Sequence, residues 1–182
     1  MSITQERDTT VIGQRLLRRE DPALLTGEAK YTNDLAIPGA LHLAVLRSPY
    51  AHARIKSIDV SDAAAMPGVV AVYTGKDLHP LWAAPMPCAW PVTTDMKNPA
   101  HFPLALDKAC YVGDGVAAVL ASSDAAARDA LDAIDVVYDP LPAVTDLQQA
   151  LSDKTIIHHS LGTNKSYTWP LKVESKIGRA HV

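Results

Sequence analysis

Short apolar runs separated by turn residues cover most of the chain after residue 40. Residues 41–47 and 53–60 each predict a strand, and Ser48-Pro49-Tyr50 joins the two as in a hairpin-like pair. In the second run, charged residues alternate with Ile55, but Ile58 breaks the alternation. Because side chains alternate between the faces of a strand, this phase break predicts a bulge or bend near Ser57.

The pentapeptide Ser-Asp-Ala-Ala-Ala occurs twice, at residues 61–65 and 123–127. Each copy predicts a helix start at which the serine accepts a hydrogen bond from a free N–H and the aspartate faces the positive end of the helix. Pro67-Gly68 keeps the first helix short. The second helix is predicted over about 124–134 because it carries an apolar stripe of Ala127, Ala130, Leu131 and Ile134.

Further strands are predicted at residues 69–73, 111–121 and 135–138, around these two helices. The chain thus contains two strand–helix–strand units together with hairpin-like pairs, which predicts an α+β domain with mixed strands.

Two short helices are predicted at the ends of this domain. Asp21 is placed to cap the first, with Pro22 at its first position and Gly27 at its end. Thr145 and Gln148 fit a capping box for the second.

Residues 80–103 form a different kind of segment. They hold six of the 13 prolines, Trp82 and Trp90, and one of the two cysteines. Prolines at this density are excluded from helix interiors and central strands. We therefore predict a long ordered loop, which is more often functional or interfacial than idle.

Composition limits the possible classes of protein. The 182 residues suit one domain. Much of the apolar content is small, with 28 alanines and only one Phe, so we expect contact with another protein surface to complete the core. A net charge of −3 without a basic stripe argues against nucleic-acid binding. The longest apolar run, Val116 to Ala121, is far below the about 20 residues of a membrane span. The first residues carry no signal pattern, which favours the cytoplasm.

Candidate metal ligands are spaced poorly. His79, Cys88, His101 and Cys110 are separated by nine, 13 and nine residues, which matches no common zinc motif. His158-His159 are adjacent, and on a strand they would point to opposite faces. We therefore predict no metal site.

Candidate catalytic groups have simpler interpretations. Asp124, Asp129 and Asp132 alternate with Arg128, which is typical of a solvated helix face. Gly113-Asp114-Gly115 lacks the third glycine of a nucleotide-binding loop and predicts a bend or a bulge.

The turn at residues 47–53 leaves two interpretations open. Its Arg47, Tyr50 and His52 are able to contact an anionic ligand, or the turn packs against its own strands. Packing is the favoured alternative.

Six blocks in order along residues 12–172 resemble one family. They are Leu-Leu-Thr-Gly at 24–27 with Tyr31 and Asp34, and the segments 38–42, 47–53, 67–78, 111–114 and 137–144. They are similar to the N-terminal α/β-hammerhead domain of molybdenum hydroxylase large subunits, the family of xanthine dehydrogenase, aldehyde oxidase and carbon monoxide dehydrogenase. Gly115 departs from a position where the family has proline.

The resemblance implies a molybdenum-dependent oxidoreductase that oxidises aldehydes, purines or carbon monoxide with water. The implied cofactor is molybdenum–molybdopterin cytosine dinucleotide. Electrons then pass to iron–sulfur clusters and FAD, on a small and a medium partner subunit, in a dimer of heterotrimers. The family's cofactor-binding and catalytic residues lie downstream of this domain, so no residue here is assigned as catalytic, cofactor-binding or metal-binding.

The expected organisation follows from this resemblance. Residues 1–15 form a flexible arm, 16–152 the hammerhead domain, and 153–175 a connection toward the missing cofactor domain. Residues 176–182 end in Ile-Gly-Arg-Ala-His-Val, which resembles a translated sequencing adapter, so we predict a non-native tail on a truncated chain. The absence of preceding cysteine-rich domains favours the separate-subunit type. The alternatives are a free-standing interaction module with the same fold and a small metal-binding protein.

Overall fold

A computed structural model describes residues 12–13 and 15–170. The chain divides into two compact units, residues 1–40 and 41–182. The predicted arm at residues 1–15 and tail at 176–182 lie largely or wholly outside the described residues.

The first unit holds α1 (Asp21–Leu25) and the 3₁₀ helix η1 (Thr32–Asp34). The second holds β1 (His42–Arg47), β2 (Ala53–Asp59), α2 (Ser61–Ala65), β3 (Val69–Thr74), α3 (Gly75–Leu78), η2 (His79–Leu81), β4 (Lys108–Ala109), β5 (Gly115–Ala121), α4 (Asp124–Leu131), β6 (Asp135–Pro140), α5 (Leu147–Leu151) and η3 (His159–Leu161).

The short helix α1 forms as predicted, but its first turn is built differently. Asp21 is the first helical residue and makes an ion pair with Arg18, whose Nε lies 3.1 Å from Oδ1. The prediction that Asp21 caps the helix is therefore wrong. Gly27 ends the turn at a φ of +75°, a conformation that glycine adopts without steric cost.

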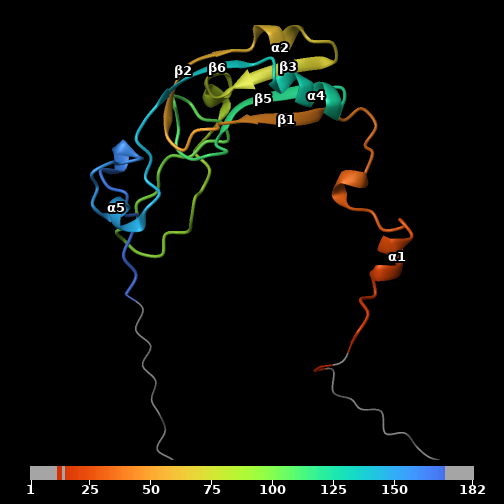
Figure 1. Cartoon of the computed structure of the whole chain (residues 1–182), viewed down its shortest axis with the longest axis horizontal. Coiled ribbons are helices and arrows are strands. Elements are labelled where there is room, and N and C mark those ends of the chain that lie inside the picture. The colour runs from red at the N-terminus through yellow and green to blue at the C-terminus, as the bar shows by residue number, and fades with distance from the viewer. Residues whose placement is uncertain (1–11, 14, 171–182) are drawn as a thin grey trace, which may run out of the picture. The chain divides into compact units, whose positions relative to one another are not determined.

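Two three-stranded antiparallel sheets form the second unit (Figure 1). The first has the order β1-β5-β3 and the second the order β4-β2-β6. Helix α4 packs on the first sheet, and α2 packs on its β3 strand. The predicted α+β class is confirmed, and the order of the strands is set by contacts between distant parts of the chain.

Each predicted strand–helix–strand unit crosses between the sheets. The chain runs from β2 through α2 to β3, and later from β5 through α4 back to β6. The strands β1 and β2 do not pair as a hairpin, because they belong to different sheets. The predicted bulge in β2 is confirmed, since its pairing with β6 shifts register between Ile55 and Ser57.

The two copies of Ser-Asp-Ala-Ala-Ala begin their helices in different ways. Ser123 caps α4, and its hydroxyl accepts a hydrogen bond from the Ala126 N–H at 3.2 Å. Ser61 instead lies inside α2, and both its N–H and its hydroxyl donate to Asp59. The predicted serine cap is thus confirmed for the second copy and wrong for the first.

Some predicted boundaries are also wrong. Strand β5 begins at Gly115 rather than at residue 111, because residues 111–114 form a turn in which Gly113 has a φ of +92°. Helix α4 ends at Leu131, short of 134. Helix α5 is capped by Asp146, whose carboxylate accepts from the Gln149 N–H at 2.7 Å, and not by Thr145.

Small side chains allow close packing in the core. Ala63, Ala117, Val119 and Ala130 are fully buried where α2 and α4 meet the first sheet. A Cβ on Gly115 would lie 2.7 Å from the Pro103 carbonyl oxygen. The backbone of residues 103–105 therefore passes directly over the end of β5.

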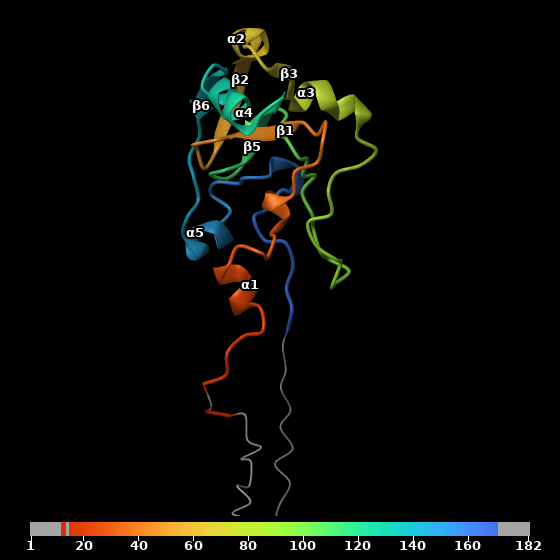
Figure 2. The ribbon, with the colours of Figure 1, turned by 90° about the vertical axis from the view of Figure 1, so that its right-hand side faces the viewer.

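The segment after α5 is held by one amide side chain. Asn164 Nδ2 donates to the carbonyl oxygens of Ala150 and Thr155, at 3.1 and 2.7 Å. Its Oδ1 accepts from the Ile157 N–H at 3.0 Å. Ser166 adds a hydrogen bond to Lys97 in the proline-rich segment. Figure 2 shows these last described residues in blue near the proline-rich loop in green. This part of the predicted connection is thus folded against the domain.

Candidate functional site

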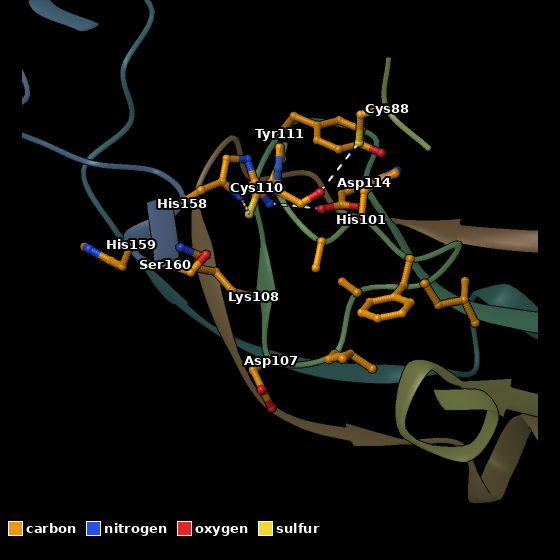
Figure 3. A pocket seen from close by; sticks show the side chains of 16 residues that line it. Cys88, His101, Asp107, Lys108, Cys110, Tyr111, Asp114, His158, His159 and Ser160 are labelled. Carbon is orange, nitrogen blue, oxygen red and sulfur yellow. Dashed lines mark hydrogen bonds between the residues drawn. The ribbon is translucent and has the colours of Figure 1, made fainter. Parts of the chain in front are cut away.

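A hollow of the second unit has a volume of about 630 Å³ and lies between the end of the proline-rich segment and η3 (Figure 3). Its polar lining includes His101, Lys108, Cys110, Asp114 and His158. Apolar atoms of the segment 99–106 form much of the remaining wall.

A buried carboxylate positions the thiol of this hollow. Asp114 is 5% exposed, and its Oδ2 accepts a hydrogen bond from the Cys110 N–H at 3.0 Å. The Asp114 carbonyl oxygen accepts from the Ser48 N–H at 2.8 Å, which ties this turn to the end of β1. The Asp114 side chain is therefore used for structure.

Cys110 and His158 lie close to each other in the hollow. The Cys110 Sγ lies 4.0 Å from His158 Nδ1. Burial raises the pKa of the Cys110 thiol. Burial, with a smaller effect of the nearby Lys108 charge, lowers the pKa of His158. Both shifts favour the neutral thiol and neutral imidazole, whereas a nucleophilic cysteine needs a thiolate beside an imidazolium.

Lys108 is also engaged in the fold. Its Nζ donates to the carbonyl oxygen of Ile157, which precedes His158. Figure 3 shows His158 turned toward Cys110 and His159 turned away from it. The prediction assumed a strand here, but His159 begins η3, so the two imidazoles separate for a different reason.

The four residues considered for zinc do not converge. Cys88, His101 and Cys110 line the hollow, but His79 packs edge-on against Phe102, with 5.0 Å between the ring centroids. Within residues 12–13 and 15–170, no group of three or more His, Cys, Asp or Glu side chains is arranged to hold a metal ion.

The turn at residues 47–53 packs against its own domain, as favoured. The Arg47 Nη1 donates to the Gly113 carbonyl oxygen at 2.8 Å. The ring of Tyr50 lies 5.0 Å from that of Tyr138. His52 is 4% exposed, and its Nδ1 lies 2.8 Å from the Pro142 carbonyl oxygen. An anionic ligand would have to displace these contacts.

Two other sequence candidates are also structural. Asp124 and Asp129 on α4, and Asp132 at its C-cap, are all exposed. The Asp124 Oδ2 lies 2.8 Å from the Arg128 Nε, which confirms the solvated face. Gly113 forms the predicted bend before β5.

The described residues do not fit a molybdenum–pterin cofactor. Such a group needs an open cradle of backbone donors. At Gly75 and Gly115, an added Cβ would lie within 3 Å of backbone oxygens of residues 103–105, so the chain itself fills the space beside these two glycines. The pairing of Cys110 with His158 was missed by sequence reasoning because 48 residues separate them. No local motif signals this pair.

No helix in the described part of the chain is long and apolar enough to cross a membrane.

Comparison with known proteins gives a consistent relationship. Residues 26–142 match the family described as aldehyde oxidase and xanthine dehydrogenase, a/b hammerhead domain. The chain is 41% identical over 145 residues to the 6-hydroxypseudooxynicotine dehydrogenase complex subunit gamma of Paenarthrobacter nicotinovorans, covering 79% of this chain and 18% of that protein. It is 35% identical over 165 residues to the carbon monoxide dehydrogenase large chain of Hydrogenophaga pseudoflava, covering 89% and 20%.

A solved structure shares the fold. The quinoline 2-oxidoreductase of Pseudomonas putida 86 is 44% identical, with a TM-score of 0.73, over 81% of this chain and 19% of that chain. The chain thus spans about a fifth of the length of these relatives. The family match covers more than half of the 182 residues, and the relatives named above are oxidoreductase subunits. The chain therefore belongs to the aldehyde oxidase and xanthine dehydrogenase hammerhead-domain family.

Proposed function

We propose that this chain is the N-terminal hammerhead portion of the molybdopterin-binding large subunit of a molybdenum-dependent oxidoreductase. One observation carries the proposal: between 79% and 89% of this chain aligns with only about a fifth of the length of the relatives, which are subunits or chains of such enzymes. The site supports this role, because its thiol and imidazole are held neutral and its carboxylate is used by the fold. The domain acts as a scaffold beside the catalytic part.

The intact enzyme oxidises an aldehyde, a purine, carbon monoxide or a related substrate with water. Molybdenum–molybdopterin cytosine dinucleotide supplies that chemistry when bound by the downstream domains, and this chain alone binds none of it. The proposed organisation has four parts: an N-terminal arm at 1–15, the hammerhead domain at 16–152, a connection at 153–175 and a non-native tail at 176–182. The cytoplasm is its proposed location.

We propose that the partners are an iron–sulfur small subunit and an FAD-binding medium subunit, in a dimer of heterotrimers. The relatives' names support separate subunits, since one is subunit gamma of a complex and another is a large chain. The loop with Trp82 and Trp90 is a proposed contact surface, because the Trp90 side chain is 87% exposed.

Two measurements test the proposal. Sequencing the locus beyond codon 176 is expected to reveal an open reading frame that continues into cofactor-binding domains. A natural stop codon there, in a neighbourhood lacking flavin and iron–sulfur subunits, would instead support the free-standing interaction module. The purified 182-residue chain is expected to contain no molybdenum by elemental mass spectrometry. A stoichiometric content would contradict the assignment of cofactor binding to the missing part.

A further inference from the structure

The sheet β1-β5-β3 has one covered face and one apolar face that the second unit leaves open. On the covered face, Leu46, Val72 and Val119 pack with α2 and α4. Side chains alternate along paired strands, so the residues between them point the other way. The register pairs Leu120 of the central strand with Leu43 on one side and Ala71 on the other, and pairs Ala118 with Val45 and Tyr73 in the same way.

These six positions form a grid of two rows across three strands, which we call the outer face. All six are apolar or aromatic, and none carries a charge. Leu43 is 62% exposed and Tyr73 is 36% exposed. Val45, Ala71 and Leu120 are half-buried, and Ala118, the smallest side chain on the central strand of the grid, is buried between its larger neighbours. Val70, the residue left unpaired by the register shift in β3, is 58% exposed beside them. A contiguous apolar patch on a sheet face is typical of a surface that another element covers.

Within the second unit, the chain covers only one end of this face. Residues 103–105 pass over Gly115 and Gly75 so closely that neither position accepts a Cβ, and Leu104 is 3% exposed there. Leu43, near the opposite end of β1, is 62% exposed, so this cover does not extend to it. An occupant of the open part would continue this layer with apolar side chains.

The size of the patch decides between possible occupants. Three strands about 4.8 Å apart and two rows about 7 Å apart give a patch on the order of a few hundred Å². A stable dimer buries roughly 800 Å² on each partner, so a second copy would be held weakly by this face. A segment tethered in the same polypeptide needs far less area, because tethering supplies an effective concentration in the mM range.

We infer that the outer face, centred on Leu43, Leu120 and Tyr73, is the docking site for an apolar segment from the cofactor-binding part of the same large subunit. This inference rests on the proposed function. The relatives support it, since about four-fifths of each lies outside the part matched by this chain.

The first arm of the test uses the 182-residue chain. We expect a monomer by light scattering, with binding of an apolar dye that falls several-fold in Leu43→Lys. The matched control is Val137→Lys, an aliphatic strand residue that is 44% exposed in the other sheet, and it is expected to leave dye binding unchanged. A concentration-dependent dimer that Leu43→Lys dissociates would identify a second copy as the occupant and overturn the inference.

The second arm places residues 26–142 into the 6-hydroxypseudooxynicotine dehydrogenase complex subunit gamma, in exchange for its matching segment. In this chimera, Leu43→Lys is expected to lower the yield of folded subunit by about tenfold, because a charge would be buried in an apolar contact. Val137→Lys is expected to leave the yield unchanged. Equal yields for the two variants would overturn the inference.

Two further results have different meanings. A chimera with Leu43→Lys that folds normally but fails to recruit the partner subunits would assign the face to a partner and overturn the inference. An unsubstituted chimera that never folds would contradict the proposed function itself.

Discussion

The carbonyl oxygen of Pro103 lies so close to Gly115 that a Cβ on residue 115 would come within 2.7 Å of it. The contact is to backbone, which cannot move aside as a flexible side chain can. Glycine at this position therefore lets residues 103–105 lie on the sheet.

Gly115→Ala is expected to reduce the free energy of unfolding by about 2 kcal/mol, because the added methyl group overpacks this contact. Urea denaturation followed by circular dichroism measures the loss. Gly162→Ala is the comparison, since Gly162 has a φ of +72° but nothing within 4 Å of its Cβ position. It is expected to cost about 1 kcal/mol from backbone strain alone. Equal losses for the two variants would contradict the close approach at Gly115.

The two serines of the repeated pentapeptide are expected to differ in stability. Ser123→Ala removes the N-cap of α4 and is expected to cost about 1 kcal/mol. Ser61→Ala removes only an exposed hydrogen bond to Asp59 within the same turn, so a loss of about 0.5 kcal/mol or less is expected. Thermal unfolding of both variants under one condition checks the order. The reverse order would show that the two helix starts are assigned wrongly.

Asn164→Ala is expected to destabilise the fold by about 2 kcal/mol, because the Ile157 N–H and the Thr155 carbonyl oxygen lose their bonds to the Asn164 amide. The Ala150 carbonyl oxygen loses one donor but keeps the Asp153 N–H. Hydrogen exchange of the Ile157 N–H is expected to accelerate in the same variant. Asn98→Ala is the control at an exposed asparagine, with an expected change within about 0.5 kcal/mol. Unchanged protection of Ile157 would show that Asn164 does not hold this segment.

Stability is expected to fall as the pH drops below about 6.5, the usual pKa of histidine. The pKa of His158 is lowered in the folded chain by burial, so the unfolded chain takes up a proton first. Its contribution is complete above the unfolded pKa and is lost as the pH falls through the folded pKa. Melting temperatures from about pH 7.5 to 5 measure this loss. His158→Gln is expected to flatten the profile, and an equally steep profile in that variant would assign the effect to another group.

Part of the fold was predictable from local patterns. The bulge near Ser57, the cap at Ser123 and the short helix α1 follow from alternation, capping chemistry and proline placement. The caps assigned to Ser61 and Thr145 were wrong because neighbouring carboxylates change the helix starts. Asp59 accepts from the N–H and the hydroxyl of Ser61 itself, and Asp146 takes the capping position by accepting from the Gln149 N–H. Several acceptors near one helix start give the same local pattern.

The candidate site was less predictable. The neutral Cys110–His158 pair depends on burial and on a contact across 48 residues. Its residues also belong to segments without regular periodicity, so neither their proximity nor their protonation follows from spacing.

The sequence by itself determined the family, the α+β class and the positions of most helices and strands, because these depend on local periodicity and on motifs that remain adjacent in the chain. The tertiary structure alone decided that β1 and β2 enter different sheets, that residues 103–105 lie over Gly115, and that Leu43 shares an open apolar face with Tyr73. Each of these depends on which distant segments approach one another. Strand pairing and close packing are set by the whole chain, so no local pattern specifies them.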